Sequence, residues 1–559
     1  MHNYLFFVQK YMTFIKLYEK SFRENFNFLA LSDYGTNVNY TYGALAEEIA
    51  KLHILFKKYN LKEGDKVSLV GKNTSNWGIV HLATFTYGAV IVPILQDFNP
   101  NDIDHIIDHS DSVLLYCSGN IWDKLDKAKF PRVKAAFSLN DFRLLHQKED
   151  EKFDYSISVL NSLFNEKYPG GFAPQHINYS DYSNDSVAVL NYTSGTTGFS
   201  KGVMITGNNL LGNMEFAESI FHLKPGDRLL SFLPLAHTYG IAFDFLYSLS
   251  SGCHTTLLGK TPAPKILMKA FDDVKPSLII SVPLIFEKIY KNMIIPLLGK
   301  KPIQLALRIS ILDKQIYAKI RKRLMNTMGG KFKQVIIGGA AFNKDAESFL
   351  LKIKFPVSVG YGMTECAPLI SFSLCEDYIP HSCGKVLDCM EVRIDSENPF
   401  KIAGEIQVKG QNVMLGYYKN EEATKAVFTE DGWLRTGDLG TIDKDNNIFI
   451  RGRSKTMILG ASGQNIFPEE IESKLNNLPY VLESLLVEKN RKLIALVYPD
   501  KDTVEKDGLS QTDLEKIMEQ NKEALNKIVA SYEKISEIQL YPNEFEKTPK
   551  KSIKRYLYV

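Results

Sequence analysis

Short apolar runs rich in β-branched residues alternate with helix-like stretches along most of the chain. These runs include Lys66–Val70, Val113–Tyr116, Val187–Tyr192, Leu278–Val282 and Val335–Ile337. Polar or glycine-rich residues follow each run and usually lead into a segment with apolar residues at helical spacing. Strands that alternate with helices are typical of parallel sheets covered by helices. The pattern therefore predicts an α/β fold with mixed, mainly parallel sheets packed against helices.

The chain has 559 residues, too many for one hydrophobic core, since a domain usually holds about 100–200 residues. The pattern of predicted strands and helices changes near residue 450, where a strand is predicted at Ile448–Arg453. A helix start at Pro468, a strand at Leu493–Tyr498 and a charged helix at Asp513–Ile528 then indicate a separate α+β unit. We predict a large N-terminal domain over 1–453 and a small C-terminal domain over 454–559.

Composition and charge are those of an ordinary globular protein, with 45% apolar residues, 23% charged residues and a formal net charge of +3. So small a charge argues against a dedicated nucleic-acid binder, which normally carries a strongly basic face. The six cysteines include no Cys-x-x-Cys pair, and no histidine stands at finger spacing from them. We expect reduced thiols in a cytosolic protein, not disulfides or a zinc site.

No secretory signal is evident at the N-terminus. Met1–Val8 is partly apolar but lacks a basic segment and a cleavage site, and Met12 is a second candidate start. The most apolar stretch, Trp77–Leu95, contains glycines and a proline. It predicts a buried helix that leads into a strand, because a membrane span needs about 20 uninterrupted apolar residues. We expect a cytoplasmic protein.

The segment Tyr192–Val203 is the strongest local signal in the sequence. It follows an apolar run and holds three glycines, four Ser or Thr hydroxyls at positions 193–197, and Lys201. Glycines let backbone N–H groups turn toward an anion, hydroxyls add donors, and the lysine adds positive charge, as a polyphosphate requires. The order is not that of a Walker loop, because no Gly-Lys-Ser/Thr occurs. The alternative is a solvated Ser/Gly linker, although linkers seldom follow a buried strand directly.

This loop is similar to the phosphate-binding signature of the adenylate-forming superfamily, which contains acyl-CoA synthetases, luciferases and peptide-synthetase adenylation domains. Further motifs follow in the order found in that family. They are Ser231–Gly240, Gly338–Ala341, Gly360–Glu365, Arg435–Gly440 and Arg451–Lys455. The resemblance extends from about Asn39 to the C-terminus. It implies a small C-terminal domain that is mobile and reorients between two half-reactions.

In this family ATP and a carboxylic acid form an acyl-adenylate, and pyrophosphate is released. The carboxylate is already a nucleophile, so the enzyme has to align two anions and offset their repulsion. The resemblance implies that Lys201 and the loop hold the β- and γ-phosphates, that Glu365 binds Mg²⁺, and that Thr364 lies beside the α-phosphate. The loop residues concerned are Thr193, Ser194, Gly195, Thr196, Thr197 and Gly198.

The adenine base has its own implied site. Tyr361, followed by Gly362, would stack on the base. Gly338, Gly339 and Ala340 would form the other wall of the slot. Taken singly, Tyr361 fits a core residue equally well, and the order of the motifs favours the site.

The ribose and the acyl group are assigned to three other residues. The resemblance implies that Asp438 accepts hydrogen bonds from the ribose hydroxyls and that Arg453 assists there. His237 would lie between the acyl pocket and the nucleotide pocket. Taken singly, Asp438 fits a turn former and His237 fits a satisfied core histidine.

Two segments are similar to those of long-chain fatty acyl-CoA synthetases. They are Leu233–His237 and Val282–Tyr290, and the second has Leu284 where that subfamily normally has arginine. The basic and apolar residues of Ile289–Arg323 then continue in helical rhythm. This segment fits either a surface helix pair or peripheral contact with the inner face of a membrane, where fatty acids partition.

Ser462–Glu472 resembles the small-domain segment that lines the tunnel for the thiol acceptor, and the hinge would fall at Lys455 or Thr456. Coenzyme A is the acceptor that the resemblance implies, and a carrier protein is the alternative.

The C-terminal tail departs from the family. There a lysine, placed shortly before a basic pair, contacts the α-phosphate during adenylation. With Lys554 and Arg555 kept in register, Ser552 takes that place. Lys551 is our candidate for the catalytic role, with Lys550 and Lys554 as alternatives.

The sequence therefore predicts a long-chain fatty acid–CoA ligase whose cofactors and substrates are ATP, Mg²⁺, a fatty acid and coenzyme A. One rival is an enzyme that loads a carrier protein. Another is a degenerate nucleotide- or acyl-binding protein with weak adenylation, which the serine at position 552 favours. No acyl chain length and no oligomeric state follow from the sequence.

Overall fold

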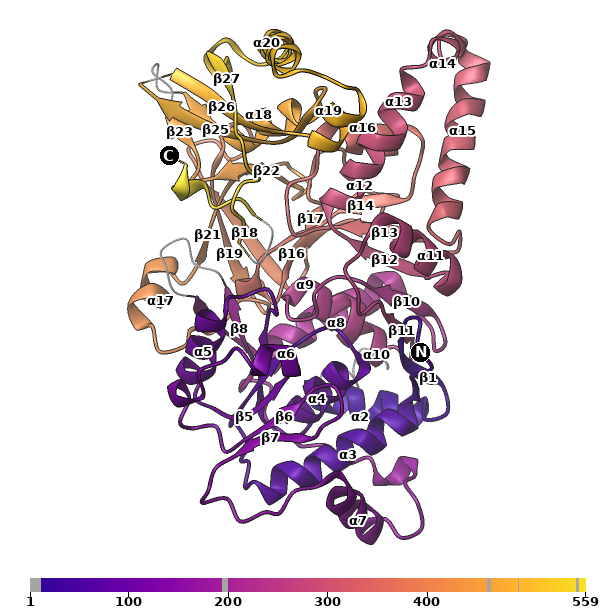
Figure 1. The fold of residues 1–559 in the computed structure, drawn as a ribbon, viewed down its shortest axis with the longest axis vertical. Helices are drawn as coiled ribbons and strands as arrows, with labels where there is room; N and C mark the ends of the chain where they lie inside the picture. The colour runs from indigo at the N-terminus through magenta and orange to yellow at the C-terminus, as the bar shows by residue number, and fades with distance from the viewer. Residues whose placement is uncertain (1–11, 194–199, 460–463, 491, 549–551, 559) are drawn as a thin grey trace.

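The computed structural model describes residues 12–193, 200–459, 464–490, 492–548 and 552–558. Its longest sheet has eight strands in the order β20-β9-β8-β4-β3-β5-β6-β7 (Figure 1). Strands β8, β4, β3, β5 and β6 run parallel, and β7, β9 and β20 add antiparallel edges. The strands are β3 Lys66–Val70, β4 Val90–Ile94, β5 Ser112–Cys117, β6 Ala135–Ser138, β7 Leu144–Gln147, β8 Val187–Thr193, β9 Lys201–Thr206 and β20 Gly416–Tyr417.

Two more sheets of the large N-terminal part are mainly parallel, with the orders β10-β11-β1-β2 and β12-β13-β14. Only β2 pairs antiparallel among these described strands. Their bounds are β1 Leu29–Asp33, β2 Asn39–Thr41, β10 Arg228–Ser231, β11 His254–Leu257, β12 Leu278–Ser281, β13 Gln334–Ile337 and β14 Val357–Val359. The predicted α/β fold with mixed, mainly parallel sheets is confirmed.

In the large part, the strands after residue 360 pair antiparallel. One sheet has the order β15-β16-β17 and the next has the order β18-β19-β21-β22. Their strands are β15 Tyr361–Gly362, β16 Leu369–Phe372, β17 Lys385–Val386, β18 Met390–Asp395, β19 Gly404–Gly410, β21 Leu434–Ile442 and β22 Ile448–Arg453. Strand β22 has the bounds that the sequence predicts.

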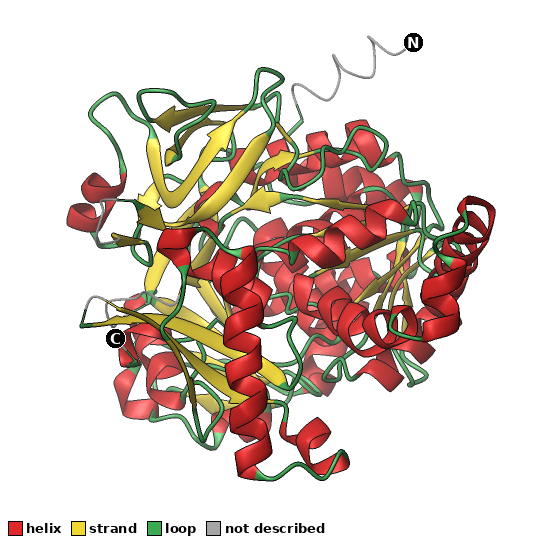
Figure 2. Ribbon diagram, turned by 90° about the horizontal axis from the view of Figure 1, so that it is seen from above, coloured by secondary structure: helices red, strands yellow, loops and turns green. Residues whose placement is uncertain are grey.

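Helices lie on both sides of the strands in the large part (Figure 2). Several begin at threonines whose hydroxyls accept a backbone N–H three residues on, as at Thr41, Thr74 and Thr206, which satisfies a donor that the helix leaves unpaired. The α-helices before residue 300 are α2 Phe14–Glu24, α3 Tyr42–Lys58, α4 Ser75–Thr86, α5 Pro100–His109, α6 Gly119–Trp122, α7 Ile157–Lys167, α8 Gly207–Phe221, α9 Thr238–Gly240, α10 Ser248–Ser250, α11 Pro264–Val274, α12 Pro283–Ile289 and α13 Ile295–Leu298. Those after it are α14 Lys301–Ala306, α15 Ser310–Thr327, α16 Lys344–Lys352, α17 Glu421–Val427, α18 Pro468–Leu475, α19 Lys501–Lys506 and α20 Gln511–Ile528.

The apolar stretch at residues 77–95 forms the buried helix α4 and the buried strand β4, as predicted. Its glycine at position 78 lets Phe245 and Leu31 pack against the helix, because a Cβ there would lie 2.9 Å from the phenylalanine ring. Within the described residues, no helix combines the length and the apolar character that crossing a bilayer needs.

The C-terminal part contains a three-stranded sheet with apolar side chains on both faces. Strands β25 Val481–Lys489 and β26 Lys492–Pro499 pair antiparallel, and β27 Glu537–Leu540 lies parallel to β26. Alternate residues of β25 and β26 point to opposite faces, so Leu486 and Ala495 join one core while Leu485 and Ile494 join another. Helices α18 and α20 contribute to the first core. A short hairpin of β23 Ile458–Leu459 and β24 Asn465–Ile466 precedes this sheet.

The cores of the two parts are separate among the described residues. The largest core runs from Phe14 to Ile448, and the two smaller ones start at Ile466 and Leu485. A domain boundary at Arg453 lies between them, and we keep this boundary as a proposal.

Candidate active site

Strands β8 and β9 frame the glycine-rich loop, because they pair antiparallel with Thr193 opposite Lys201. The loop residues Ser194, Gly195, Thr196, Thr197 and Gly198 lie outside the described residues. The pairing of β8 with β9 therefore holds the two residues that flank the loop, Thr193 and Lys201, opposite each other.

Lys201 and Glu365 both contact one tyrosine, Tyr417. The Lys201 ammonium lies 4.8 Å from the centre of the Tyr417 ring, and the Tyr417 hydroxyl donates to Glu365 Oε1 at 2.9 Å. Burial and the nearby Glu365 carboxylate raise the pKa of Tyr417, so its hydroxyl keeps its proton. Strand β20 holds the tyrosine in place, because Tyr417 pairs with Val203 of β9. The site therefore presents a cation and a carboxylate, which suit phosphate and Mg²⁺ respectively.

A cavity lies where the carboxyl ends of β13 and β14 meet. In a parallel sheet these ends share one edge, so Gly338 and Gly339 follow β13 there, and Gly360 follows β14. The predicted residues His237, Gly338, Gly339, Tyr361, Gly362 and Thr364 all line this cavity. The lining also includes Phe221, Thr238, Tyr239, Phe243, Ile336, Gly360, Met363, Pro368, Leu369 and Phe372. Ala340 is exposed and is not part of the lining.

Two positions of the cavity require glycine, one because of close backbone packing and the other because of its backbone conformation. A Cβ at Gly362 would lie 2.1 Å from the carbonyl oxygen of Pro368. Gly339 has φ +86°, a conformation that L side chains rarely adopt. These two glycines therefore line the cavity and also allow the backbone conformation and packing found there.

Tyr361, Asp438 and Arg453 form a connected polar group. The Tyr361 hydroxyl donates to Asp438 Oδ2 at 2.7 Å, and Arg453 Nε lies 3.0 Å from Asp438 Oδ1. Strand pairing sets the second contact, because Asp438 of β21 is opposite Arg453 of β22. Asp438 is buried, whereas the Arg453 side chain is 67% exposed.

The electrostatics of this group favour bound donors at Asp438. Burial, the largest cause, raises the pKa of Asp438, the Arg453 charge and the Tyr361 hydroxyl lower it, the Glu365 and Glu469 charges raise it, and the net shift is upward. Burial is also the main cause that raises the pKa of Tyr361, followed by the Asp438 charge. A buried carboxylate whose ionised form is poorly compensated is a strong acceptor for further hydroxyl donors.

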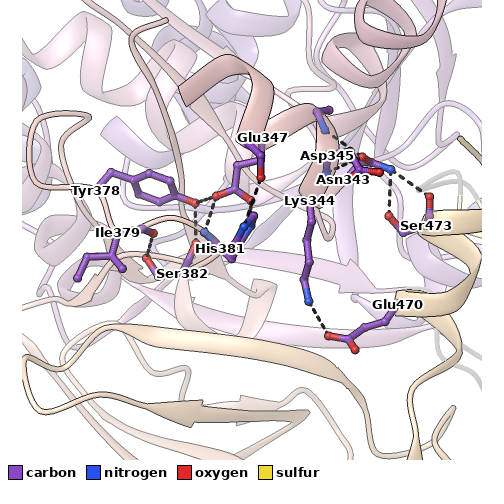
Figure 3. Close-up of polar contacts among 12 residues, drawn as sticks. Asn343, Lys344, Asp345, Glu347, Tyr378, Ile379, His381, Ser382, Glu470 and Ser473 are labelled. Carbon is purple, nitrogen blue, oxygen red and sulfur yellow. Dashed lines mark hydrogen bonds and ion pairs between the residues drawn. The ribbon is translucent and has the colours of Figure 1, made fainter. Parts of the chain in front are cut away.

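The small C-terminal part contacts the large part through helices α16 and α18 (Figure 3). Asn343 caps α16 with its Oδ1 and uses its Nδ2 to donate to the backbone and side-chain oxygens of Ser473, each at 3.1 Å. Lys344 lies 2.8 Å from Glu470 Oε1. Further along α16, Glu347 accepts hydrogen bonds from the Tyr378 hydroxyl and from His381, which ties the helix to the large part.

A second contact between the parts starts from the segment after α12. The Lys291 ammonium donates to the carbonyl oxygens of Asn476, at 3.2 Å, and Val481. Burial lowers the pKa of Lys291. Together with the α16 contacts, this lysine holds the end of α18 in one orientation relative to the cavity.

The C-terminal lysines are only partly described. Lys550 and Lys551 lie outside the described residues. Ser552 is exposed, and its carbonyl accepts from the backbone N–H of Thr548 at 2.8 Å. Lys554 lies 3.6 Å from Glu546 of its own part, an ion pair that does not involve the cavity.

The structure adds two residues that the sequence analysis did not assign. Tyr417 contacts both Lys201 and Glu365, and its only sequence signal is the Gly-Tyr-Tyr run at positions 416–418. Tyr239 lines the cavity and donates to the carbonyls of Ser281 and Ile336 at 3.3 and 3.2 Å. It tethers the His237 segment to β12 and β13.

Comparison with known proteins places this fold and site in one family. Residues 18–418 match the AMP-binding enzyme family, and the chain belongs to that family, as the motifs predicted. The long-chain-fatty-acid–CoA ligase FadD15 of Mycobacterium bovis is 28% identical over 476 residues, which cover 80% of this chain and 74% of the ligase. The luciferin 4-monooxygenase of Photuris pensylvanica is 25% identical over 475 residues, covering 82% and 78%.

The fold is also that of solved structures in the same class. The ATP-bound structure of MatB from Rhodopseudomonas palustris superposes with a TM-score of 0.75 at 22% sequence identity, covering 98% of each chain. Both the large part and the small part of the molecule therefore share the fold of that solved structure.

Proposed function

We propose that this chain activates a long-chain fatty acid with ATP and transfers the acyl group to coenzyme A. In the first half-reaction, a carboxylate oxygen bonds to the α-phosphorus, the bond to the β-phosphate oxygen breaks, and pyrophosphate leaves. In the second, the coenzyme A sulfur bonds to the acyl carbon, its proton goes to solvent, and AMP leaves. Neither step needs a side-chain nucleophile, so the work of the protein is alignment and charge stabilisation.

The observation that carries this proposal is the Lys201–Tyr417–Glu365 group, in which Glu365 directly follows Thr364 of the cavity lining. Lys201 would stabilise the charge that accumulates on the β- and γ-phosphates as pyrophosphate leaves. Glu365 would hold Mg²⁺, and Thr364, the preceding residue, would lie beside the α-phosphate. The described residues hold no cluster of three His, Cys, Asp or Glu side chains suited to a metal ion. Mg²⁺ would therefore take most of its ligands from phosphate oxygens and water, as this ion commonly does.

The nucleoside would occupy the cavity between the two glycine-containing turns. Adenine would stack on Tyr361 and face Gly338 and Gly339, and the ribose hydroxyls would donate to Asp438. Arg453 would keep that carboxylate ionised. Two observations support the assignment. Tyr361, Gly338 and Gly339 line the same cavity, and Tyr361 is joined to Asp438 and Arg453 by polar contacts.

Two observations support an apolar acid. Part of the cavity lining is aromatic, with Phe221, Phe243 and Phe372 among it, and this part would bury methylene groups of an acid bound next to the nucleoside. A relative that matches 80% of this chain is named a long-chain-fatty-acid–CoA ligase. The test is a panel of acids from acetate to stearate, assayed for AMP production with and without coenzyme A. Release of AMP that is greatest with short acids would refute the long-chain assignment.

Two alternative functions, a carrier-loading enzyme and a non-catalytic binding protein, predict different results in these assays. Formation of acyl-CoA by the purified protein, with no carrier protein present, would exclude carrier loading as a requirement. Absence of pyrophosphate release with ATP, Mg²⁺ and palmitate, and with every other acid of the panel, would instead identify a degenerate binding protein.

The tail lysine needs its own comparison. We propose Lys551 for the α-phosphate, with Lys550 and Lys554 as alternatives. Lys551→Ala should lower adenylation far more than thioester formation from supplied acyl-adenylate. Lys554 already has an acidic neighbour, Glu546, so Lys554→Ala should have the smaller effect. Loss of adenylation in Lys554→Ala but not in Lys551→Ala would show that the other lysine serves.

A further inference from the structure

The helices α13, α14 and α15 form a projection whose far end is α14, at the end away from β12 and β13 (Figure 1). We call residues 300–314 the helical tip. Leu305, Ile309, Ile311 and Leu312 of the tip are 63%, 52%, 71% and 38% exposed. Helix α14 contains no buried residue. Single exposed apolar side chains are common on proteins, but four large ones within eight residues indicate an interaction surface.

The apolar stripe of α15 explains why these side chains lack a partner. Leu324 and Ile320 are buried, and Ile316 is partly buried, at successive steps of four residues along one face. The next position toward the tip on the same face is Leu312, which is the first of the stripe to be exposed. The body of the protein therefore covers the stripe up to Ile316, and the tip carries it beyond the body.

Basic residues surround this apolar end. Lys300, Lys301, Arg308 and Lys314 belong to the tip and are exposed, and Asp313 is the one acid in the segment. Within the described residues, no salt bridge involves any of these basic side chains. The whole chain has a net charge of only +3, so positive charge is concentrated at the tip.

We propose that the helical tip docks on the surface of an anionic lipid bilayer. The exposed leucines and isoleucines would enter the boundary between headgroups and acyl chains, and the lysines and arginine would contact the anionic headgroups. Charge complementarity selects this partner, because the four cations of the tip outnumber its single acid and would gain contacts to anionic headgroups that an apolar protein surface does not offer. The proposal does not depend on the ligase activity, since it rests on the surface of the tip alone.

Vesicle sedimentation tests the proposal with the full-length protein. One set of vesicles contains phosphatidylcholine alone, and a second contains phosphatidylcholine mixed with phosphatidylglycerol. We expect sedimentation with the mixed vesicles that falls as salt is raised, since salt screens exposed charges. The variant Leu305→Glu/Ile311→Glu should bind these vesicles about tenfold more weakly or worse, and so should Lys301→Gln/Arg308→Gln.

Phe400→Glu is the matched control, because Phe400 is 60% exposed on the turn between β18 and β19. It should bind vesicles as the unmodified protein does. Equal sedimentation of the Leu305→Glu/Ile311→Glu variant and the unmodified protein would overturn the proposal. So would equal binding to neutral and anionic vesicles. Self-association in solution that this variant abolishes, without vesicle binding by the unmodified protein, would show that a second copy of the chain covers the tip instead.

Discussion

The substitution Asp438→Asn separates the proposed ribose contact from the structural role of this residue. Asparagine has nearly the same shape, and its Oδ1 can still accept the hydrogen bond that Tyr361 donates at 2.7 Å. What the substitution removes is the negative charge and one acceptor. Arg453 loses its ion-pair partner, but its side chain is 67% exposed, so that loss is worth about 0–1 kcal/mol.

The expected effect on nucleotide affinity is larger. A hydrogen bond to a charged group contributes about 1.5–3 kcal/mol, and the loss of one such bond to a ribose hydroxyl corresponds to about a 10- to 150-fold rise in Kd. Calorimetric titration with AMP measures this directly. Titration with 2′,3′-dideoxy-AMP is the control, because it lacks the hydroxyls that Asp438 would bind. Asp438→Asn should weaken binding of AMP and leave binding of the dideoxy nucleotide nearly unchanged.

The effect on stability should have the opposite sign. Burial raises the folded-state pKa of Asp438 above its unfolded value, so the ionised carboxylate is disfavoured in the folded protein. Such a group contributes its full stability below the unfolded pKa and loses it as the pH rises through the folded pKa. At neutral pH, Asp438→Asn should therefore leave the thermal unfolding midpoint unchanged or raise it. Equal weakening of both nucleotides would refute the ribose assignment, and a lower midpoint would contradict the predicted effect on stability.

Three other substitutions test the packing around the site. Tyr417→Phe keeps the aromatic ring and removes the hydroxyl donor, so palmitate-dependent pyrophosphate release should fall by about tenfold, and a rate unchanged at all Mg²⁺ concentrations would count against its role. Gly362→Ala places a Cβ 2.1 Å from a carbonyl oxygen and should lower the unfolding free energy by about 3 kcal/mol or more, whereas Gly170→Ala, with no atom within 4 Å, should not. Asn343→Ala should speed proteolysis between the two parts of the chain. Asn99→Ala removes a similar helix cap, on α5, and should not affect that cleavage.

Local pattern was sufficient for most of the fold. The strand at Ile448–Arg453 and the helix and strand within 77–95 could be predicted because their apolar spacing and their turn residues agree. The glycine motifs could be placed at the cavity because they follow strands whose carboxyl ends meet. The antiparallel sheet of β18, β19, β21 and β22 was not foreseen, since mixed charged and apolar residues on a half-exposed sheet give a weak signal.

The site contacts could not be predicted from local pattern in the same way. Tyr417 reaches Lys201 only because β20 pairs with β9 more than two hundred residues earlier in the chain. The bond from Tyr361 to Asp438 likewise joins residues 77 positions apart. Such contacts depend on sheet register, which the hydrophobic pattern of one short strand does not specify. The position of Ala340 outside the cavity depends on the turn that follows β13, where Gly339 has a positive φ.

Arg453 connects the proposed ribose site to Thr456 of the proposed hinge. Arg453 binds the Asp438 carboxylate with its side chain, and its carbonyl accepts the Thr456 hydroxyl at 3.2 Å. The same hydroxyl also lies 2.7 Å from Glu469 at the start of α18. The polar contacts are thus continuous from Tyr361 in the cavity to the first turn of the helix that touches α16. A rotation of the small part about residues 454–456 therefore has to break or rebuild contacts that begin at Arg453. For this reason, occupancy of Asp438 and the orientation of the small part should affect each other.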